Sequence, residues 1–351
     1  MIRKRNVSAR VLDGFDDPTL DPAQWERLLG DCQTDIVYLT WQWQRTWWEV
    51  FQPGDLLLIA VERNGRLAAI APLYVDSGMA YFVGSGFESG YLDFIGESKA
   101  EVIDAILETA RDRFPCLEGF EFYFVPDSSG TGRRLRTAAN RSGLGCYQAD
   151  RVPSPVLNLA CPEIALAATQ KKDALQRERI LRREGKLEVR CLQDGEAILE
   201  NLEEFFAQHT SRWIAKTGSG RFENPQQRTF IRRLTKVTAS TGWLRFIRAD
   251  WEGVPIAFQY GFCYRGRYVR QMSSFAIDKA RFAPGQVLLR HSFLLAIAEG
   301  AHTYDFGIGD QPYKHRFAST INYVRKWGLY KHGGYPGSGL KVQAQAIQPA
   351  V

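Results

Sequence analysis

Runs of apolar residues separated by turn residues predict strands and helices in a recurring order. Residues 55–75 contain two strand-like runs on either side of Asn64-Gly65, and this dipeptide fits a tight two-residue turn, so we expect an antiparallel hairpin. The elements that follow are a strand pair at 81–96, an amphipathic helix at 98–114, a buried strand at 119–125, a basic helix at 130–143 and a strand at 151–159.

The second half of the chain repeats this order. After helices within 161–185, 196–218 and 225–241 come a strand meander at 242–275, a helix at 287–300, a strand at 302–309, a short helix at 311–319 and a strand at 321–333. Strand meander, helix, strand, helix, strand therefore occurs twice, which indicates a duplicated domain. We expect a mixed α+β chain with two tandem domains, 1–160 and 161–351, each a mostly antiparallel sheet flanked by helices.

Composition narrows the class of protein. The 351 residues are 45% hydrophobic, and the net charge of +6 favours an anionic partner. No apolar run approaches the ~20 residues that cross a bilayer, and the basic start is not followed by an apolar signal segment. Six scattered cysteines show neither a CxxC pair nor zinc spacing. We therefore expect a cytoplasmic protein with reduced structural thiols and no metal.

The loop before the helix at 287–300 is the first candidate site. It comprises Arg281, Ala283, Pro284, Gly285 and Gln286. Proline in a first helical turn leaves backbone N–H groups unpaired, so this helix start can receive a pyrophosphate group. The alternative is an ordinary strand-to-helix turn. The corresponding segment of the first half, 95–99, carries a carboxylate, so the second half is the one expected to bind a phosphorylated carrier.

A second candidate site lies at residues 304–315. Strand alternation puts Asp305 on the face opposite Tyr304 and Phe306, and two glycines then lead to a short helix with Tyr313 and Lys314. The alternatives are that Asp305 caps the next helix or pairs with an arginine, and that Lys314 is a surface lysine. The chain lacks the HRD loop of kinases and the GxSxG, GxxxxGK[ST] and HExxH motifs, which removes the commonest hydrolase, NTPase and metalloprotease signatures.

Residues 282–318, FAPGQVLLRHSFLLAIAEGAHTYDFGIGDQPYKHRFA, resemble the C-terminal signature of the CelD-like branch of GNAT acyltransferases, which is related to the Fem-type aminoacyl transferases. Further matches are WQWQRTWW at 41–48, SGYLDFIG at 89–96, Arg182-Arg183 in a basic helix and HTSRW at 209–213. The resemblance implies two GNAT-like domains, with acetyl-CoA or another acyl-CoA bound by the C-terminal one. It also implies that Lys314 contacts phosphate or stabilises the reacting carbonyl oxygen.

The reaction expected from this resemblance is attack of a neutral amine on a thioester. Asp305 or His209 is the candidate base, Lys314 or a strand N–H the oxyanion donor, and Tyr313 the acid. The family association suggests an amino sugar, or a precursor of an exported polysaccharide or the cell envelope, as acceptor. The candidate acceptor-binding residues are Tyr91, Asp93 and Arg182.

Two other functions remain open from the sequence. The loop departs from the usual GNAT arrangement of Gln or Arg followed by two spaced glycines, and Fem-type relatives use aminoacyl-tRNA, so a tRNA donor is one alternative. The basic helix at Lys171–Arg183 would then contact phosphates, although its mixed charges also suit a plain solvated face. The other alternative is a non-catalytic effector that binds a nucleotide or glycan.

Overall fold

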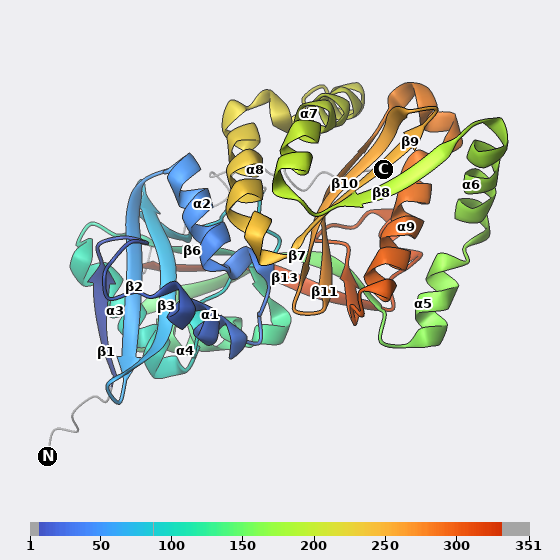
Figure 1. Cartoon of the computed structure of the whole chain (residues 1–351). Helices are drawn as coiled ribbons and strands as arrows, with labels where there is room; N and C mark the ends of the chain where they lie inside the picture. The colour runs from blue at the N-terminus through green and yellow to red at the C-terminus, as the bar shows by residue number, and fades with distance from the viewer. Residues whose placement is uncertain (1–6, 87, 332–351) are drawn as a thin grey trace, which may run out of the picture. The chain divides into compact units, whose positions relative to one another are not determined.

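The computed structural model describes residues 7–86 and 88–331, and the chain forms two compact units. The described part of the first unit comprises 7–153, 308–310 and 322–331, and the second comprises 154–307 and 311–321. Each unit is a mostly antiparallel sheet flanked by helices, so the predicted mixed α+β class is confirmed (Figure 1). Strands β7 and β13 run from one unit into the other.

The sheet of the first unit has the strand order β1-β2-β3-β4-β6-β13, and β5 pairs with β3. Its elements are β1 (Val7–Leu12), α1 (Pro22–Gly30), η1 (Val37–Leu39), α2 (Trp41–Phe51), β2 (Asp55–Arg63), β3 (Arg66–Asp76), β4 (Met79–Phe82), β5 (Ile95–Gly96), α3 (Ala100–Arg113), β6 (Gly119–Pro126), η2 (Asp127–Ser129), α4 (Thr131–Arg141), the first part of β7 (Leu144–Asn158) and most of β13 (Thr320–Lys331).

The predicted hairpin is present as β2 and β3, with Arg63 opposite Arg66 across the turn. Asn64 and Gly65 both have positive φ, 54° and 72°. Asparagine and glycine adopt this left-handed conformation with little strain, which is why the dipeptide specifies the turn.

The segment 81–96 differs from the predicted strand pair. It contains only the end of the four-residue β4 and the two-residue β5, and these two strands pair with β3 and not with each other. The glycines at 84, 86, 90 and 96 explain the difference, because glycine weakens a strand interior.

The second unit contains the strand order β7-β12-β11-β10-β9-β8. Its remaining elements are α5 (Pro162–Thr169), α6 (Lys172–Glu184), β8 (Leu187–Leu192), α7 (Gly195–Thr217), η3 (Arg221–Glu223), α8 (Pro225–Thr238), η4 (Ala239–Thr241), β9 (Leu244–Trp251), β10 (Val254–Tyr264), β11 (Arg267–Phe275), η5 (Ile277–Phe282), α9 (Pro284–Ala298), β12 (Thr303–Asp305) and α10 (Pro312–His315).

Helices cover both faces of this second sheet. On one face, Val287, Leu288 and Phe293 of α9 share a buried cluster with Ile247 of β9 and Ala257 of β10. On the other face, the ring of Phe205 on α7 packs against Phe246 of β9 and Phe258 of β10. The sheet is therefore a buried middle layer between helices.

The duplication is visible in the strand pairing. Each unit contains a parallel pair whose strands are joined through a helix: β4 and β6 with α3, and β11 and β12 with α9. In both parallel strand pairs, the last of the three paired positions holds a buried carboxylate: Glu121 opposite Tyr81, and Asp305 opposite Val269. Within the part of the chain that the structure describes, no helix has the length and apolar character needed to cross a membrane.

Candidate active site

The carboxyl end of the parallel pair β11–β12 brings several chemically active side chains together. Pairing between the two strands ends at Val269 opposite Asp305, so Arg270 is the first residue of β11 beyond the ladder. A bulge in the pairing with β10 follows directly. Both α9 and α10 begin on the carboxyl side of these strands, and in α/β sheets ligands bind at such ends.

Arg270 is the centre of the polar contacts. Its Nη1 donates to the phenol oxygen of Tyr313 over 2.5 Å, its Nε donates to Oε1 of Gln259 over 3.2 Å, and its Nη2 donates to Oγ of Ser273. Gln259 also donates to the hydroxyl of Tyr304 over 3.3 Å. The guanidinium is therefore fixed from three sides, and its contact with Tyr313 connects β11 to α10.

Arg212 on α7 reaches the same strand. Its Nη1 donates to the carbonyl oxygen of Ser273 over 3.2 Å, and its Cζ lies 4.4 Å from the ring centre of Phe275. Burial, and then the charge of Arg270, lowers the pKa of Arg212. The charge of Arg270 thus disfavours that of Arg212, whereas the pKa of Arg270 is itself raised, against its burial, by the nearby Tyr313.

Asp305 and Lys314, two of the predicted catalytic residues, both contact Gly307. The N–H of Gly307 donates to Oδ1 of Asp305 over 2.8 Å, and Nζ of Lys314 donates to the carbonyl oxygen of Gly307 over 3.0 Å. Asp305 is fully buried, and its Oδ2 lies 3.7 Å from Nη1 of Arg267. These contacts hold the turn between β12 and α10, the helix that carries Tyr313.

The predicted donor loop ends in an uncapped helix start. Ala283, with a φ of 48°, precedes Pro284 at the first position of α9, and no side chain accepts a hydrogen bond at this N-terminus. A Cβ added at Gly285 would lie 3.5 Å from Cδ1 of Phe275, an ordinary contact. Arg281 is exposed, and Gln286 donates its N–H to the carbonyl of Ala283 over 2.9 Å. The first turn of α9 therefore has no side-chain cap, a feature of helix starts that bind anions.

His209, the other predicted base, is enclosed by aromatic rings. Its ring centre lies 5.9 Å from that of Phe205 and 4.9 Å from that of Phe222. Burial, followed by the charges of Arg221 and Arg212, lowers the pKa of His209 to about 3. The imidazole is therefore neutral near pH 7 and holds a proton weakly.

Arg182, predicted to bind substrate, takes part in an ion-pair cluster around Glu178. The guanidinium of Arg182 donates to Oε1 of Glu178 over 2.9 Å. From α9, Arg290 donates to Oε2 over 2.7 Å, and Nε2 of His291 lies 3.2 Å from Oε1. This cluster joins α6 to α9, and among the described residues Arg182 contacts Glu178 and the Leu187 carbonyl and not Arg212 or Arg270.

The predicted acceptor-binding residues Tyr91 and Asp93 lie in the first unit. Both are buried. Thr34 and Thr131 donate their hydroxyls to the Asp93 carboxylate over 2.9 and 2.7 Å, and the Phe94 N–H donates over 2.9 Å. Burial raises the pKa of Asp93 despite these donors. Asp93 thus ties together three segments of its unit.

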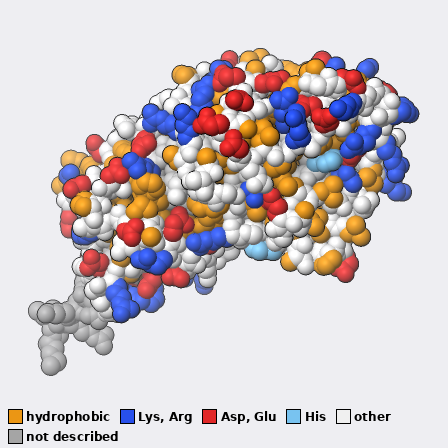
Figure 2. Space-filling model, viewed as in Figure 1, with side chains coloured by type: hydrophobic (Ala, Val, Ile, Leu, Met, Phe, Trp, Pro, Cys, Tyr) orange, Lys and Arg blue, Asp and Glu red, His pale blue; other side chains and the backbone are white. Residues whose placement is uncertain are grey.

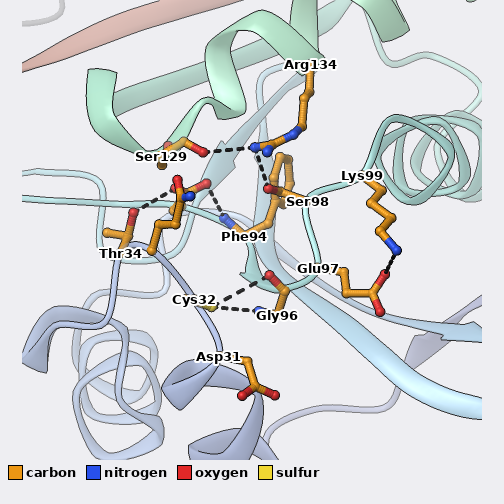
Figure 3. Close-up of a pocket in the computed structure, with 12 residues that line it drawn as sticks. Asp31, Cys32, Thr34, Phe94, Gly96, Glu97, Ser98, Lys99, Ser129 and Arg134 are labelled. Carbon is orange, nitrogen blue, oxygen red and sulfur yellow. Dashed lines mark hydrogen bonds and ion pairs between the residues drawn. The ribbon is translucent and has the colours of Figure 1, made fainter.

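A pocket of about 200 Å³ opens beside Asp93 (Figure 3). Arg134 of α4 points to Ser98. Its Nη1 donates to Oγ of Ser98 over 2.8 Å and to the carbonyl oxygen of Ser129 over 2.8 Å. On the opposite wall the N–H of Gly96 donates to Sγ of Cys32 over 2.8 Å. Most residues that line the pocket are polar, with Phe94 also in its wall, and all of them belong to the first unit.

The sequence interpretation missed Arg212, Arg270, Ser273 and Gln259 as site residues. Arg212 lies within the HTSRW motif, but only His209 of that motif was selected. Arg270 stands two positions after Tyr268 in an otherwise strand-like run, and a charged residue at a core-facing strand position is the signal that points to it. The contacts of these residues with one another follow only from the tertiary structure.

Residues 168–315 match the family model described as Acetyltransferase (GNAT) domain. This range contains α7, β11, the loop before α9 and α10. No curated protein sequence matches the chain.

Solved structures resemble the chain over most of its length. A crystal structure of FemX aligns with a TM-score of 0.64 and 11% identity, covering 90% of this chain and 97% of that one. A tandem GNAT protein from the clavulanic acid biosynthesis pathway has a TM-score of 0.53 and 12% identity, with 93% and 98% covered. L-PGS from Bacillus licheniformis has a TM-score of 0.53 and 13% identity, with 89% and 91% covered. At these identities the likeness establishes the fold, which is of the GNAT acyltransferase type.

Proposed function

We propose that this chain transfers an acyl group from an acyl-CoA to an amine at the carboxyl end of β11 and β12. The observation that carries the proposal is the uncapped start of α9 at Pro284-Gly285, which follows β11 through the short helix η5. Its first-turn N–H groups and positive dipole end suit the pyrophosphate of coenzyme A. Arg281, Ala283 and Gln286 complete the proposed donor loop.

Tyr313 is the proposed proton donor and relay. Because its phenol oxygen accepts from Arg270, the O–H is directed away from the guanidinium and can be donated. The neutral amine forms a bond to the thioester carbonyl, the C–S bond breaks, and the proton lost by nitrogen passes through Tyr313 to the departing sulfur. A positioned acid of this kind typically contributes about 10²–10⁴-fold to the rate.

Asp305 and Lys314 serve this reaction through Gly307. They fix the turn that presents Tyr313, and Lys314 also places a positive charge near the reacting carbonyl oxygen. His209, with its low pKa, is assigned to shaping the site and not to taking the proton.

The acceptor is proposed to be an amino sugar or a related precursor of an exported polysaccharide or the cell envelope. Support comes from the CelD-like resemblance of residues 282–318. An acyl-CoA donor would place the reaction in the cytoplasm. The assignment of Tyr91, Asp93 and Arg182 to acceptor binding stays a prediction, and of these residues Asp93 lines the first-unit pocket.

Calorimetric titration with acetyl-CoA tests the donor assignment. Gly285→Ala should bind like the wild type, because the added Cβ makes only an ordinary contact. Gly285→Gln and Gly285→Glu have nearly the same size, so a loss of affinity confined mainly to Gly285→Glu identifies repulsion of an anionic donor at this helix start. Equal affinity of the Gln and Glu variants contradicts the proposed site.

A Fem-like transfer from aminoacyl-tRNA is the second candidate, favoured by the exposed basic side chains of α6. Lys172, Arg177, Arg179 and Arg183 are all exposed, and Lys and Arg gather where Figure 1 labels α6 (Figure 2). Binding of tRNA that falls steeply with salt, in a protein that does not bind acetyl-CoA, supports this candidate. Absence of both forms of binding leaves the non-catalytic role.

A further inference from the structure

Arg212 and Arg270 converge on a single residue of β11. Arg212 donates to the carbonyl oxygen of Ser273 over 3.2 Å, and Arg270 donates to its hydroxyl. Burial and the nearby Arg270 charge lower the pKa of Arg212. Holding two like charges together in a partly buried place costs free energy when no ligand is bound.

Neither of these arginines has a carboxylate partner among the described residues. Several other arginines of the same unit do: Arg190 and Arg248 pair with Asp250, Arg245 with Glu299, Arg267 with Asp305, and Arg290 with Glu178. The excess positive charge at Ser273 is therefore a local feature and not a general property of the unit.

The guanidinium of Arg212 retains most of its hydrogen-bonding capacity. It carries five N–H donors, and the structure gives it one acceptor, the carbonyl of Ser273. Its flat face lies on the ring of Phe275, and both arginines are partly exposed. A guanidinium packed against an aromatic ring, with most of its N–H donors unpaired, suits an oxyanion ligand.

Two further polar atoms near Arg212 lack a hydrogen-bond partner. Nδ1 of His209 and Nε1 of Trp213 are both buried and unpaired, and the two rings lie 6.0 Å apart, one turn from each other on α7. Trp213 is also 6.0 Å from Cζ of Arg212. Buried polar groups are normally hydrogen-bonded, so a ligand hydroxyl or an ordered water would complete this part of α7.

We propose that Arg212 and Arg270 form an oxyanion-binding subsite, and that the amine acceptor carries a carboxylate or phosphate group that binds there. Both Arg212 and Gly285 neighbour the ring of Phe275, so the pair lies close to the proposed donor loop. The assignment of this anion to the acceptor rests on the proposed acyl transfer. Anion binding by the arginine pair can be measured whether or not acyl transfer occurs.

Calorimetric titration of the whole chain with inorganic phosphate, and separately with malonate, tests the subsite. Affinity for at least one of them should fall tenfold or more in Arg212→Gln and in Arg270→Gln. It should be unchanged in the control Arg190→Gln, whose partner Asp250 keeps its contact with Arg248. Binding that is equal in all variants, or absent in the wild type, overturns the proposal.

Repeating the titration with saturating coenzyme A separates the two sources of an anion. Unchanged phosphate or malonate binding supports an acceptor subsite, whereas competition by coenzyme A assigns the pair to donor phosphates and overturns the acceptor assignment. If the protein binds phosphate through the arginine pair but does not bind acetyl-CoA, the anion subsite stands and the proposed acyl-CoA donor is wrong.

Folding controls keep the result interpretable. Arg212→Gln removes one of two mutually repelling charges, so its melting temperature should equal or exceed that of the wild type. Arg212→Lys keeps the charge but loses the planar fork, and it should bind the anion with an affinity between those of the wild type and Arg212→Gln. An Arg212→Lys variant that binds as tightly as the wild type, beside a weakened Arg212→Gln, would show that the charge suffices and that the fork has no role in binding.

Discussion

Arg270 and Tyr313 meet through a 2.5 Å hydrogen bond although 43 positions separate them in the chain. The bond runs from Nη1 on β11 to the phenol oxygen on α10, and it leaves the O–H to be donated. Because Arg270 is also held by Gln259 and Ser273, the phenol is positioned by a rigid group. The proposed chemistry depends first on this pair.

Replacing Tyr313 by Phe removes the proton relay and little else. We expect kcat to fall about 100-fold or more, in line with the loss of a positioned acid, while the acetyl-CoA affinity stays unchanged. Steady-state kinetics and calorimetry measure the two effects. The control is Tyr323→Phe, because Tyr323 contacts Arg151 through its ring face. A turnover equal to that of the wild type would remove Tyr313 from the mechanism.

Lys314→Met tests the support of the turn at Gly307. The change leaves the Gly307 carbonyl without its lysine donor, so we expect a loss of about 1–3 kcal/mol in the free energy of unfolding. We also expect kcat to fall more than tenfold in the folded protein, at unchanged donor affinity. Denaturant titration and kinetics on the same preparation check both effects. Unchanged turnover of the folded variant would contradict the role of Lys314.

The lowered pKa of Glu178 makes the free energy of unfolding depend on pH. Hydrogen bonding to His291 and then to Arg182, with the charge of Arg290, lowers the pKa of Glu178 from 4.5 to about 2. The Glu178 carboxylate therefore binds a proton more tightly in the unfolded chain than in the folded one. The stabilisation from the ionised carboxylate is complete above pH 4.5 and is lost as the pH falls towards 2.

Glu178→Gln should abolish that component and lower stability near neutral pH by about 3 kcal/mol, because Arg290 loses its partly buried partner. Urea denaturation from pH 7 to pH 3 measures the effect. Glu184→Gln is the matched control on the same helix, since Glu184 is exposed and pairs with Arg183. Parallel pH profiles of wild type and Glu178→Gln would show that Glu178 does not contribute.

The cysteines should react in order of exposure and without loss of catalysis. Burial raises the pKa of the Cys32 thiol to about 12, whereas Cys116 is exposed. Iodoacetamide at pH 8 should therefore modify Cys116 rapidly and Cys32 only after unfolding, as mass spectrometry of peptides would report. Acyl transfer should survive the modification of Cys116. Inactivation that follows Cys116 alkylation would reopen the covalent cysteine mechanism.

Several features of the chain were readable from the sequence because they depend on neighbouring residues. Asn64-Gly65 specifies its own turn through left-handed backbone conformations. Pro284-Gly285 marks the start of α9, and the repeated order of strands and helices predicted the tandem α+β fold. The segment 81–96 was over-interpreted as a strand pair, because its aromatic residues suggest strands while its glycines disfavour regular pairing.

Tertiary structure alone decided which side chains meet. Arg212 contacts Ser273 from 61 positions away, and Arg270 contacts Tyr313 from 43, so neither contact leaves a local pattern in the sequence. They depend on the point where β11 and β12 stop pairing and on how α7 packs against β11. The sequence by itself determined the turns, the helix starts and the duplicated fold, since these are set by local backbone preference and the spacing of apolar residues. The arginine pair and the orientation of Tyr313 were decided by long-range packing.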